Sequence, residues 1–205
     1  SNNAFTIPLN SNYKMNVKSL TNIQVNVNSI VMSNFNFYVK PSVQESPENW
    51  FIWNGNQILG LSKLGALQKN IVLPSKATSI TSNAFYNNKT LEFVDMSLLN
   101  IEQLPNNQSL NVSLFTNCVN LINVILPNNF KVINRAMFLN CNNPNFNVSI
   151  PTSVTSIGLY AFNGLSNTAK IYVPNDTIRN LVLNSSQSID PDKVTSNQVI
   201  IKNNK

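Results

Sequence analysis

A segment of about 23 residues recurs along residues 70–175, and this repeat constrains the fold more than any other feature of the chain. Residues 71–85 read IVLPSKATSITSNAF, residues 124–138 read VILPNNFKVINRAMF, and residues 148–162 read VSIPTSVTSIGLYAF. A degenerate copy ends at Phe115, and a last copy opens at residues 171–174 as IYVP. A unit this short cannot bury its own apolar side, so successive copies must stack. The repeat therefore predicts a solenoid in which each copy is one coil.

The copies agree best around a phenylalanine that ends the repeated segment. Four copies align on it with steps of 30, 23 and 24 residues, at Phe85, Phe115, Phe138 and Phe162. An isoleucine or leucine stands five residues earlier, at positions 80, 110, 133 and 157. Stacking at a strand spacing of about 4.8 Å would make each set a buried column. An asparagine or glycine two residues later fits a turn with positive φ, and a proline is expected to close each strand, at positions 74, 127, 151 and 174.

The two cysteines, Cys118 and Cys141, both stand three residues after a column phenylalanine. They therefore fall in one column of adjacent coils, where a disulfide is sterically conceivable. We favour two reduced, buried thiols acting as small apolar side chains, because Asn88 and Leu165 fill the same column in the flanking coils.

These residues resemble the BspA-like leucine-rich repeat, whose pattern runs close to L-x-x-V-x-I-P-x-x-V-x-x-I-x-x-x-A-F-x-x-C-x-x-L. The match is closest at residues 121–141 and 146–165, good at 70–91 and weak at 92–114. The weak copy lacks the proline and carries about seven extra residues around 99–108, which we expect to bulge from the convex side. The resemblance implies a β-rich solenoid, a right-handed leucine-rich-repeat superhelix.

The resemblance also implies a C-terminal cap and a location. Residues 170–174 followed by a helix over 176–184 look like the family's cap, with Asn175 or Asp176 as the N-cap. The family is associated with cell-surface, adhesin-like proteins, so the resemblance implies an extracellular or surface-displayed module.

Residues 1–50 do not follow the repeat. Strict alternation of apolar and polar residues, clearest at 23–28 and 34–39, predicts half-buried strands, which we expect to pair antiparallel, and residues 40–49 read as a linker. The expected domains are residues 1–50 as a small β module or N-terminal cap, 51–175 as the solenoid, and 176–205 as a C-terminal cap with a short helix and then a strand. The aromatic cluster at 50–53 is either a stacking platform for a sugar or base, or a plug at the junction between the β module and the first coil, which we favour.

Composition argues against catalysis. The chain has no histidine and only eight Asp and Glu residues, which excludes histidine bases and leaves little material for carboxylate pairs. The close pairs Glu45/Glu48 and Asp190/Asp192 lie in proline-containing loops, where we expect solvated turn residues. We therefore expect no enzyme, cofactor or metal site.

The basic balance does not indicate a nucleic-acid site. The net charge is +6, but no two basic residues are adjacent and only two are arginine, the residue that suits bidentate contacts to phosphate and guanine. No apolar run approaches the length of about 18 residues that a membrane span needs. We expect neither nucleic acid nor membrane insertion.

Binding through the strands is better supported. Strand residues that do not point inward form a side-by-side surface, and the expected inward pairs are 71/73, 94/96, 124/126, 148/150 and 171/173. This leaves one outward row at positions 72, 95, 125, 149 and 172, and an adjacent row at 70, 93, 123, 147 and 170. The candidate partner-binding residues are Val72, Phe93, Asp95, Ile125, Ser149, Lys170 and Tyr172. Phe93, Ile125 and Tyr172 would act as anchors, although an ordinary solvated sheet face also exposes scattered apolar residues.

The leading hypothesis is an adhesin-like interaction module that presents this rigid face to a protein or glycan. An architectural spacer of a larger surface protein is the main alternative, and uniformly small polar residues on the face would favour it. An enzyme hidden in residues 1–69 is a third alternative, which a deep pocket with convergent polar groups would favour.

Overall fold

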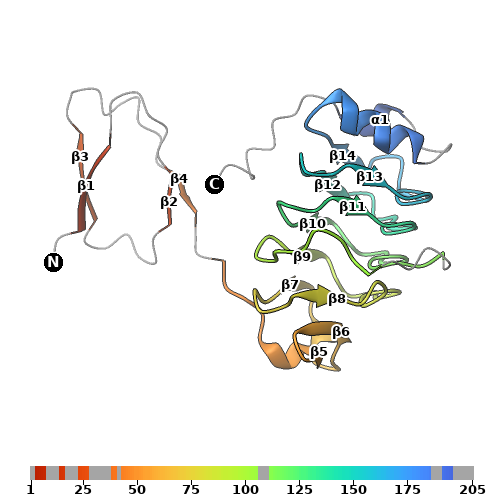
Figure 1. Cartoon of the computed structure of the whole chain (residues 1–205), viewed down its shortest axis with the longest axis horizontal. Coiled ribbons are helices and arrows are strands. Elements are labelled where there is room, and N and C mark those ends of the chain that lie inside the picture. Colours follow the sequence, from red (N-terminus) through yellow and green to blue (C-terminus); the bar gives the residue numbers. More distant parts are fainter. Residues whose placement is uncertain are drawn as a thin grey trace. The chain divides into compact units, whose positions relative to one another are not determined.

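The computed structural model describes residues 3–7, 14–16, 23–27, 38–40, 43–105, 111–185 and 191–195 (Figure 1). The chain forms two compact units, residues 1–44 and residues 45–205, and each is described by itself.

The N-terminal unit contains four short strands, and all of its described pairings are parallel. Strand β1 (Asn3–Ile7) pairs with β3 (Ile23–Val27), and β2 (Lys14–Asn16) pairs with β4 (Tyr38–Lys40). The expected antiparallel pairing is therefore wrong. Alternation reports which faces of a strand differ but not its direction, and the segment between β1 and β3 is long enough for a parallel crossover. The alternation at Phe35 and Phe37 lies outside the described residues.

The second unit is a solenoid, as the repeat predicts. One strand from each coil joins a six-stranded parallel sheet (Figure 1), in the order β15 (Val194–Thr195), β14 (Lys170–Tyr172), β12 (Asn147–Ser149), β10 (Asn123–Ile125), β9 (Phe93–Asp95) and β7 (Asn70–Val72). The register aligns residues 70, 93, 123, 147 and 170, so successive coils are 23, 30, 24 and 23 residues long.

A second row of strands runs along the coils. Strand β8 (Ser79–Ile80) pairs with β6 (Gln57–Leu61), and β11 (Val132–Ile133) pairs with β13 (Ser156–Ile157), again in parallel. The coils that begin at β10 and β12 therefore bond to each other in both rows, which fixes their relative orientation.

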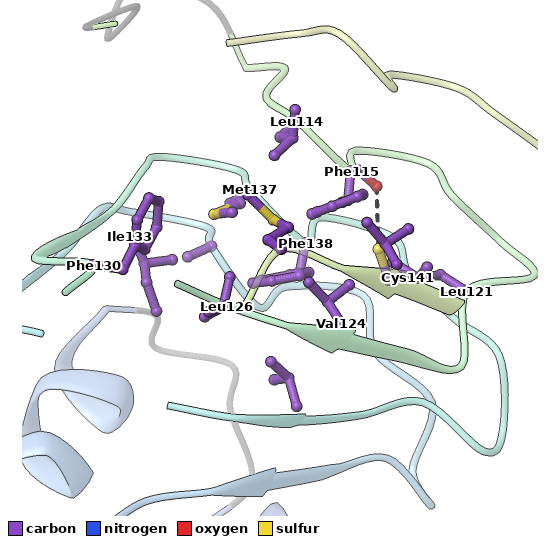
Figure 2. Packing of buried hydrophobic residues seen from close by; sticks show 14 of the residues in the cluster. Leu114, Phe115, Leu121, Val124, Leu126, Phe130, Ile133, Met137, Phe138 and Cys141 are labelled. Atoms are coloured by element: carbon purple, nitrogen blue, oxygen red, sulfur yellow. Dashed lines mark hydrogen bonds between the residues drawn. The ribbon is translucent and has the colours of Figure 1, made fainter. Parts of the chain in front are cut away.

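The phenylalanine column is confirmed. Ring centroids of Phe85 and Phe115 lie 5.7 Å apart, and Phe138 lies 5.6 Å from both Phe115 and Phe162. All four side chains are buried, and Figure 2 shows Phe115 and Phe138 within the core. In the aliphatic column, Ile80 and Ile133 are buried and Ile157 is half-buried, whereas position 110 lies outside the described residues.

The predicted turns with positive φ are also confirmed. The values are +62°, +60°, +60° and +72° at Asn87, Asn117, Asn140 and Gly164. Two further residues, Ala136 and Tyr160, adopt φ values of +59° and +61°, a region that residues other than glycine rarely occupy. Their backbone N–H groups bond to the next coil or the cap, at Leu159 O and Ser185 O, which holds the strained conformation.

Asparagine side chains link neighbouring coils, which gives a structural reason for part of the chain's 40 asparagines. A short amide can reach across the spacing of about 4.8 Å between strands, because it carries both donors and an acceptor. Such bonds join Asn140 Nδ2 to Asn117 Oδ1 at 2.9 Å, Asn143 Nδ2 to Asn120 O at 3.3 Å, and Asn123 Nδ2 to Asn147 Oδ1 at 2.8 Å.

The N-terminal edge of the six-stranded sheet is covered by residues that the sequence suggests are a linker. The N–H of Ser46 donates to Val72 O at 3.0 Å, and Ser46 Oγ accepts from Val72 N at 2.8 Å. A 3-10 helix η2 (Glu48–Trp50) follows at once. The linker interpretation is therefore wrong for residues 45–49, which protect an otherwise open strand edge.

The aromatic cluster belongs to a hairpin that covers the first coil. Strand β5 (Phe51–Asn54) pairs antiparallel with β6, and the 3-10 helix η3 (Gly65–Leu67) follows the hairpin. Phe51 is buried, and Trp50 and Trp53 are partly buried against the core. Trp53 Nε1 donates to Glu48 O at 2.9 Å, and Lys76 Nζ lies 4.4 Å from the Trp53 ring centroid. These contacts show the cluster packed against the first coil rather than free as a stacking platform.

The expected C-terminal helix forms with the expected bounds. Helix α1 (Asp176–Asn184) begins at an Asn175 N-cap, whose Oδ1 accepts from Ile178 N at 2.9 Å, and Ile178 and Val182 are buried. A 3-10 helix η4 (Pro191–Lys193) leads into β15. No helix in the described part of the chain is long and apolar enough to cross a membrane.

The extra residues of the weak copy are located more narrowly than the sequence suggests. A bulge beginning at residue 99 is wrong, because Leu99, Ile101 and Leu104 are buried in the core. The carbonyl of Glu102 accepts from Lys131 N at 2.6 Å, and its carboxylate lies 2.8 Å from Lys131 Nζ. Residues 99–104 are therefore part of the coil.

The difference in length falls between Pro105 and Asn111. Asn134 Nδ2 lies 3.5 Å from Pro105 O, and Arg135 Nη2 donates to Asn111 Oδ1 at 2.8 Å. Asn134 and Arg135 are consecutive, whereas five residues, 106–110, separate Pro105 from Asn111 in the sequence. They lie outside the described residues.

Candidate partner-binding surface

The sheet register places all seven candidate residues on one face of the six-stranded sheet. One row contains Val72, Asp95, Ile125, Ser149 and Tyr172, and the adjacent row contains Asn70, Phe93, Asn123, Asn147 and Lys170. We call these two rows the strand face. The alternate side chains of the same strands are no more than 3% exposed, at Ile71, Leu73, Val94, Met96, Val124, Leu126, Val148, Ile150, Ile171 and Val173. The expected inward and outward assignment is thus confirmed, while the binding role stays a prediction.

Phe93 is the most prominent apolar side chain on the strand face. It is 43% exposed, whereas Val72, Ile125 and Tyr172 are half-buried. Phe93 pairs with Asn70 and Asn123 across its two neighbouring strands. An exposed aromatic ring beside shorter polar side chains is available to pack against a partner.

Asp95 is held in a fixed position on the same strand. Its register neighbours are Val72 and Ile125, and its Oδ1 accepts from the N–H of Ser97 at 2.8 Å. Ser97 occupies the position where the well-matched coils have proline, which has no N–H to donate. Because the weak copy has serine instead of proline at this position, a backbone N–H is present to donate the hydrogen bond that orients the carboxylate.

The far end of the strand face has a second charged and aromatic pair. Lys170 is exposed and Tyr172 is half-buried, and both lie on the outward side of β14. Asp95 and Lys170 form no ion pair within the described residues, whereas Lys69 and Glu92, just before β7 and β9, pair with each other at 3.3 Å. Among the described residues, the strand face thus has one acid and one base that take part in no ion pair.

Two asparagines at the centre of the strand face were not among the candidates. Asn123 Nδ2 donates to Asn147 Oδ1 at 2.8 Å and to Asn147 O at 2.9 Å, and Asn147 Nδ2 donates to Ile122 O at 3.2 Å. Their recurrence in adjacent copies is the signal that could have identified them. Because these amides already bond to each other and to the backbone, the centre of the face is neutral and ordered.

The structure gives the cysteines a structural role. Cys118 and Cys141 are buried and unbonded to each other, as we favour from the sequence. Cys118 Sγ donates to Phe85 O at 3.2 Å and Cys141 Sγ to Phe115 O at 3.1 Å, the latter shown in Figure 2. Burial raises the pKa of Cys118 to about 12 and raises the pKa of Cys141 well above its usual value.

We expect both thiols to resist DTNB in the folded protein at pH 8 and to react, two per chain, after unfolding, since little thiolate forms and access is blocked. Above the ordinary thiol pKa of about 8.5 the folded state keeps protons that the unfolded state loses. The free energy of unfolding should then fall by up to about 1.4 kcal/mol per pH unit for each thiol. In a Cys118→Ala, Cys141→Ala variant the free energy of unfolding should fall less steeply with pH. Fast labelling of the folded wild type by DTNB would contradict the burial of the two thiols.

The other candidates for chemistry are occupied by structural contacts. Hydrogen bonds from Ser75 lower the pKa of the Glu45 carboxyl, and the Glu48 carboxylate lies 2.5 Å from Lys76 Nζ. Asp190 lies outside the described residues. Within the described ranges, no group of three or more Cys, Asp or Glu side chains could hold a metal ion.

Comparison with known proteins identifies the repeat. The sequence profile of the BspA type leucine rich repeat region matches residues 91–204 in six copies, which is more than half of the chain. The chain belongs to the BspA-type leucine-rich-repeat family. The coil that contains β7 lies outside the matched range, but β7 pairs with β9 in the same sheet. No curated protein and no solved structure gave a match.

Proposed function

We propose that this BspA-type chain is a non-catalytic interaction module, secreted or displayed at a cell surface, that binds a protein or glycan through the strand face. The family suggests a surface-associated protein-interaction scaffold. The observation that carries the proposal is Phe93, a large aromatic side chain 43% exposed beside the oriented carboxylate of Asp95. Aromatic residues, phenylalanine included, are enriched at the core of protein interfaces.

The mechanism is presentation of a rigid surface. Each strand-face residue lies on a strand bonded to its neighbours, and the side chains beneath it are buried. A partner would therefore meet a backbone that is already fixed, so association loses little backbone entropy on this side. Catalysis has no place in this proposal, since the module acts by holding its partner.

The test is capture of partners by the full chain, with surface proteins and a glycan array as probes. Phe93→Ala and Tyr172→Ala should each weaken binding about 10-fold or more, because truncating a hot-spot anchor typically costs about 2 kcal/mol or more. Tyr86→Ala is the matched control, since Tyr86 is also aromatic and 43% exposed but lies in a turn outside the strand face.

Equal binding by wild type, Phe93→Ala and Tyr172→Ala would remove the strand face as the binding surface. No binding to either class of probe would favour the architectural spacer. Circular dichroism of each variant separates lost binding from lost folding.

A further inference from the structure

We infer that the partner is a protein segment that sets a basic side chain against Asp95 and an acidic side chain against Lys170. This inference rests on the proposed function and names the chemistry of the partner. It follows from the pattern of charge and aromatic residues on the strand face.

Two strands of the strand face, β9 and β14, carry similar pairs of residues with opposite charge. Phe93 and Asp95 stand two residues apart on β9, and Lys170 and Tyr172 stand two residues apart on β14, so each pair shares the outward side of one strand. Between them β10 and β12 present Asn123, Ile125, Asn147 and Ser149, which carry no charge. A partner lying across the strands would therefore meet acid with aromatic at one end and base with aromatic at the other.

Both charges are available to a partner. The described part of the chain has three ion pairs, Lys69–Glu92, Lys76–Glu48 and Lys131–Glu102, and none of them includes Asp95 or Lys170. The neighbouring pair Lys69–Glu92 is already neutralised. Asp95 lies between two aliphatic neighbours, where partial exclusion of water strengthens its attraction for a cation.

The Asp95 end suits an arginine in particular. A guanidinium can bond a carboxylate through two N–H groups while its plane lies against an aromatic ring, and Phe93 is exposed on the same strand. At the other end the Lys170 ammonium and the Tyr172 hydroxyl are both donors, and a carboxylate would accept from them.

The opposite charges favour a protein over the other classes of macromolecule. An anionic glycan or a nucleic acid would be repelled by Asp95, and a neutral glycan would leave both charges unpaired. A polypeptide supplies both signs within one short segment. The strands β9 and β14 are three steps apart in the sheet, or about 14 Å, which an extended segment spans in about four residues.

The test is selection from a yeast-displayed library of random 12-residue peptides on the full chain. Wild type should enrich peptides with one basic and one acidic residue about four positions apart. Asp95→Lys makes both ends basic and should enrich peptides with two acids, whereas Lys170→Glu makes both ends acidic and should enrich peptides with two bases. Asp95→Asn keeps an oxygen that can accept from the Ser97 N–H but removes the charge. It should weaken the binding of peptides selected on wild type about 10-fold.

Matched controls change charge away from the strand face. Lys63→Glu makes the same change in net charge as Lys170→Glu, at an exposed loop position after β6, and Glu102→Gln removes one acid as Asp95→Asn does. Both should select and bind the same peptides as wild type. Circular dichroism of every variant tests for intact folding.

The outcomes separate this inference from the proposed function. Peptides that require Phe93 but keep one charge pattern on wild type, Asp95→Lys and Lys170→Glu would overturn the charged pair while leaving the strand face as a binding surface. Peptides that bind Phe93→Ala as well as wild type would remove the strand face itself. No enrichment, or binding only to a glycan array, would overturn the choice of a protein segment.

Discussion

Replacing Phe138 with alanine should lower the free energy of unfolding by about 3–5 kcal/mol. Phe138 is fully buried and stacks on Phe115 and Phe162, at interplanar angles of 11° and 9°, and its ring centroid lies 5.6 Å from that of Phe146. Removing the ring would leave a cavity at the centre of the column. Backbone hydrogen bonds fix the spacing between neighbouring coils, so the coils cannot move together to fill it. Guanidinium denaturation followed by circular dichroism measures the loss.

Phe93→Ala is the control for this prediction, since it removes the same side chain from a position that is 43% exposed, and it should cost less than about 1 kcal/mol.

A solenoid depends on contacts between neighbouring coils, so Phe138→Ala should also uncouple the unfolding of its two ends. Fluorescence of Trp50 and Trp53, which lie beside the first coil, should then report a transition separate from that seen by circular dichroism. A loss for Phe138→Ala no greater than that for Phe93→Ala would contradict the buried column.

The repeat made most of this solenoid predictable, because every copy tests the same assignment. A single phenylalanine says little, but Phe85, Phe115, Phe138 and Phe162 recur with aligned neighbours and indeed form one column. The same reasoning located the turns of positive φ at asparagine or glycine, since residue type restricts φ directly. Helix α1 was predictable from its Asn175 N-cap and the residues that follow.

Features set by interactions between distant segments were not predictable in this way. Alternation in residues 1–44 gives strands but not their direction, which depends on the route of the connections. Residues 45–49 contain two charged residues and a proline and look like a linker, yet Ser46 bonds to Val72 because the sheet has an open edge there. Positive φ at Ala136 and Tyr160 goes against residue preference and is imposed by bonds to Leu159 O and Ser185 O.

The candidate surface was predictable in outline, because the inward residues of the repeat define the outward ones. The bond from Ser97 to Asp95 was not identified, although the missing proline in that copy is a visible signal. Likewise Asn123 and Asn147 recur in the sequence, but only the structure shows that their amides bond to one another.

Gly158→Ala should destabilise the protein by about 3 kcal/mol, the upper end of the usual cost of overpacking, although alanine in place of glycine often stabilises a protein where the backbone allows it. A Cβ at this position would overlap the backbone of the preceding coil, at Arg135 N, Arg135 Cα and Asn134 C. Gly158 N also donates to Ile133 O at 2.8 Å, which fixes the separation of the two coils. Because the overlapping atoms are backbone, no side-chain rotation can relieve the contact, and the coils must separate.

Gly60→Ala is the matched control for this steric argument. Its Cβ would meet Ala84 O at 3.3 Å, a contact that a small shift relieves, so the change in the free energy of unfolding should stay within about 1 kcal/mol. Guanidinium denaturation of both variants gives the comparison. If Gly158→Ala were as stable as Gly60→Ala, the close approach of the coils at Arg135 would be wrong, and with it the tight spacing that places successive strand-face residues side by side.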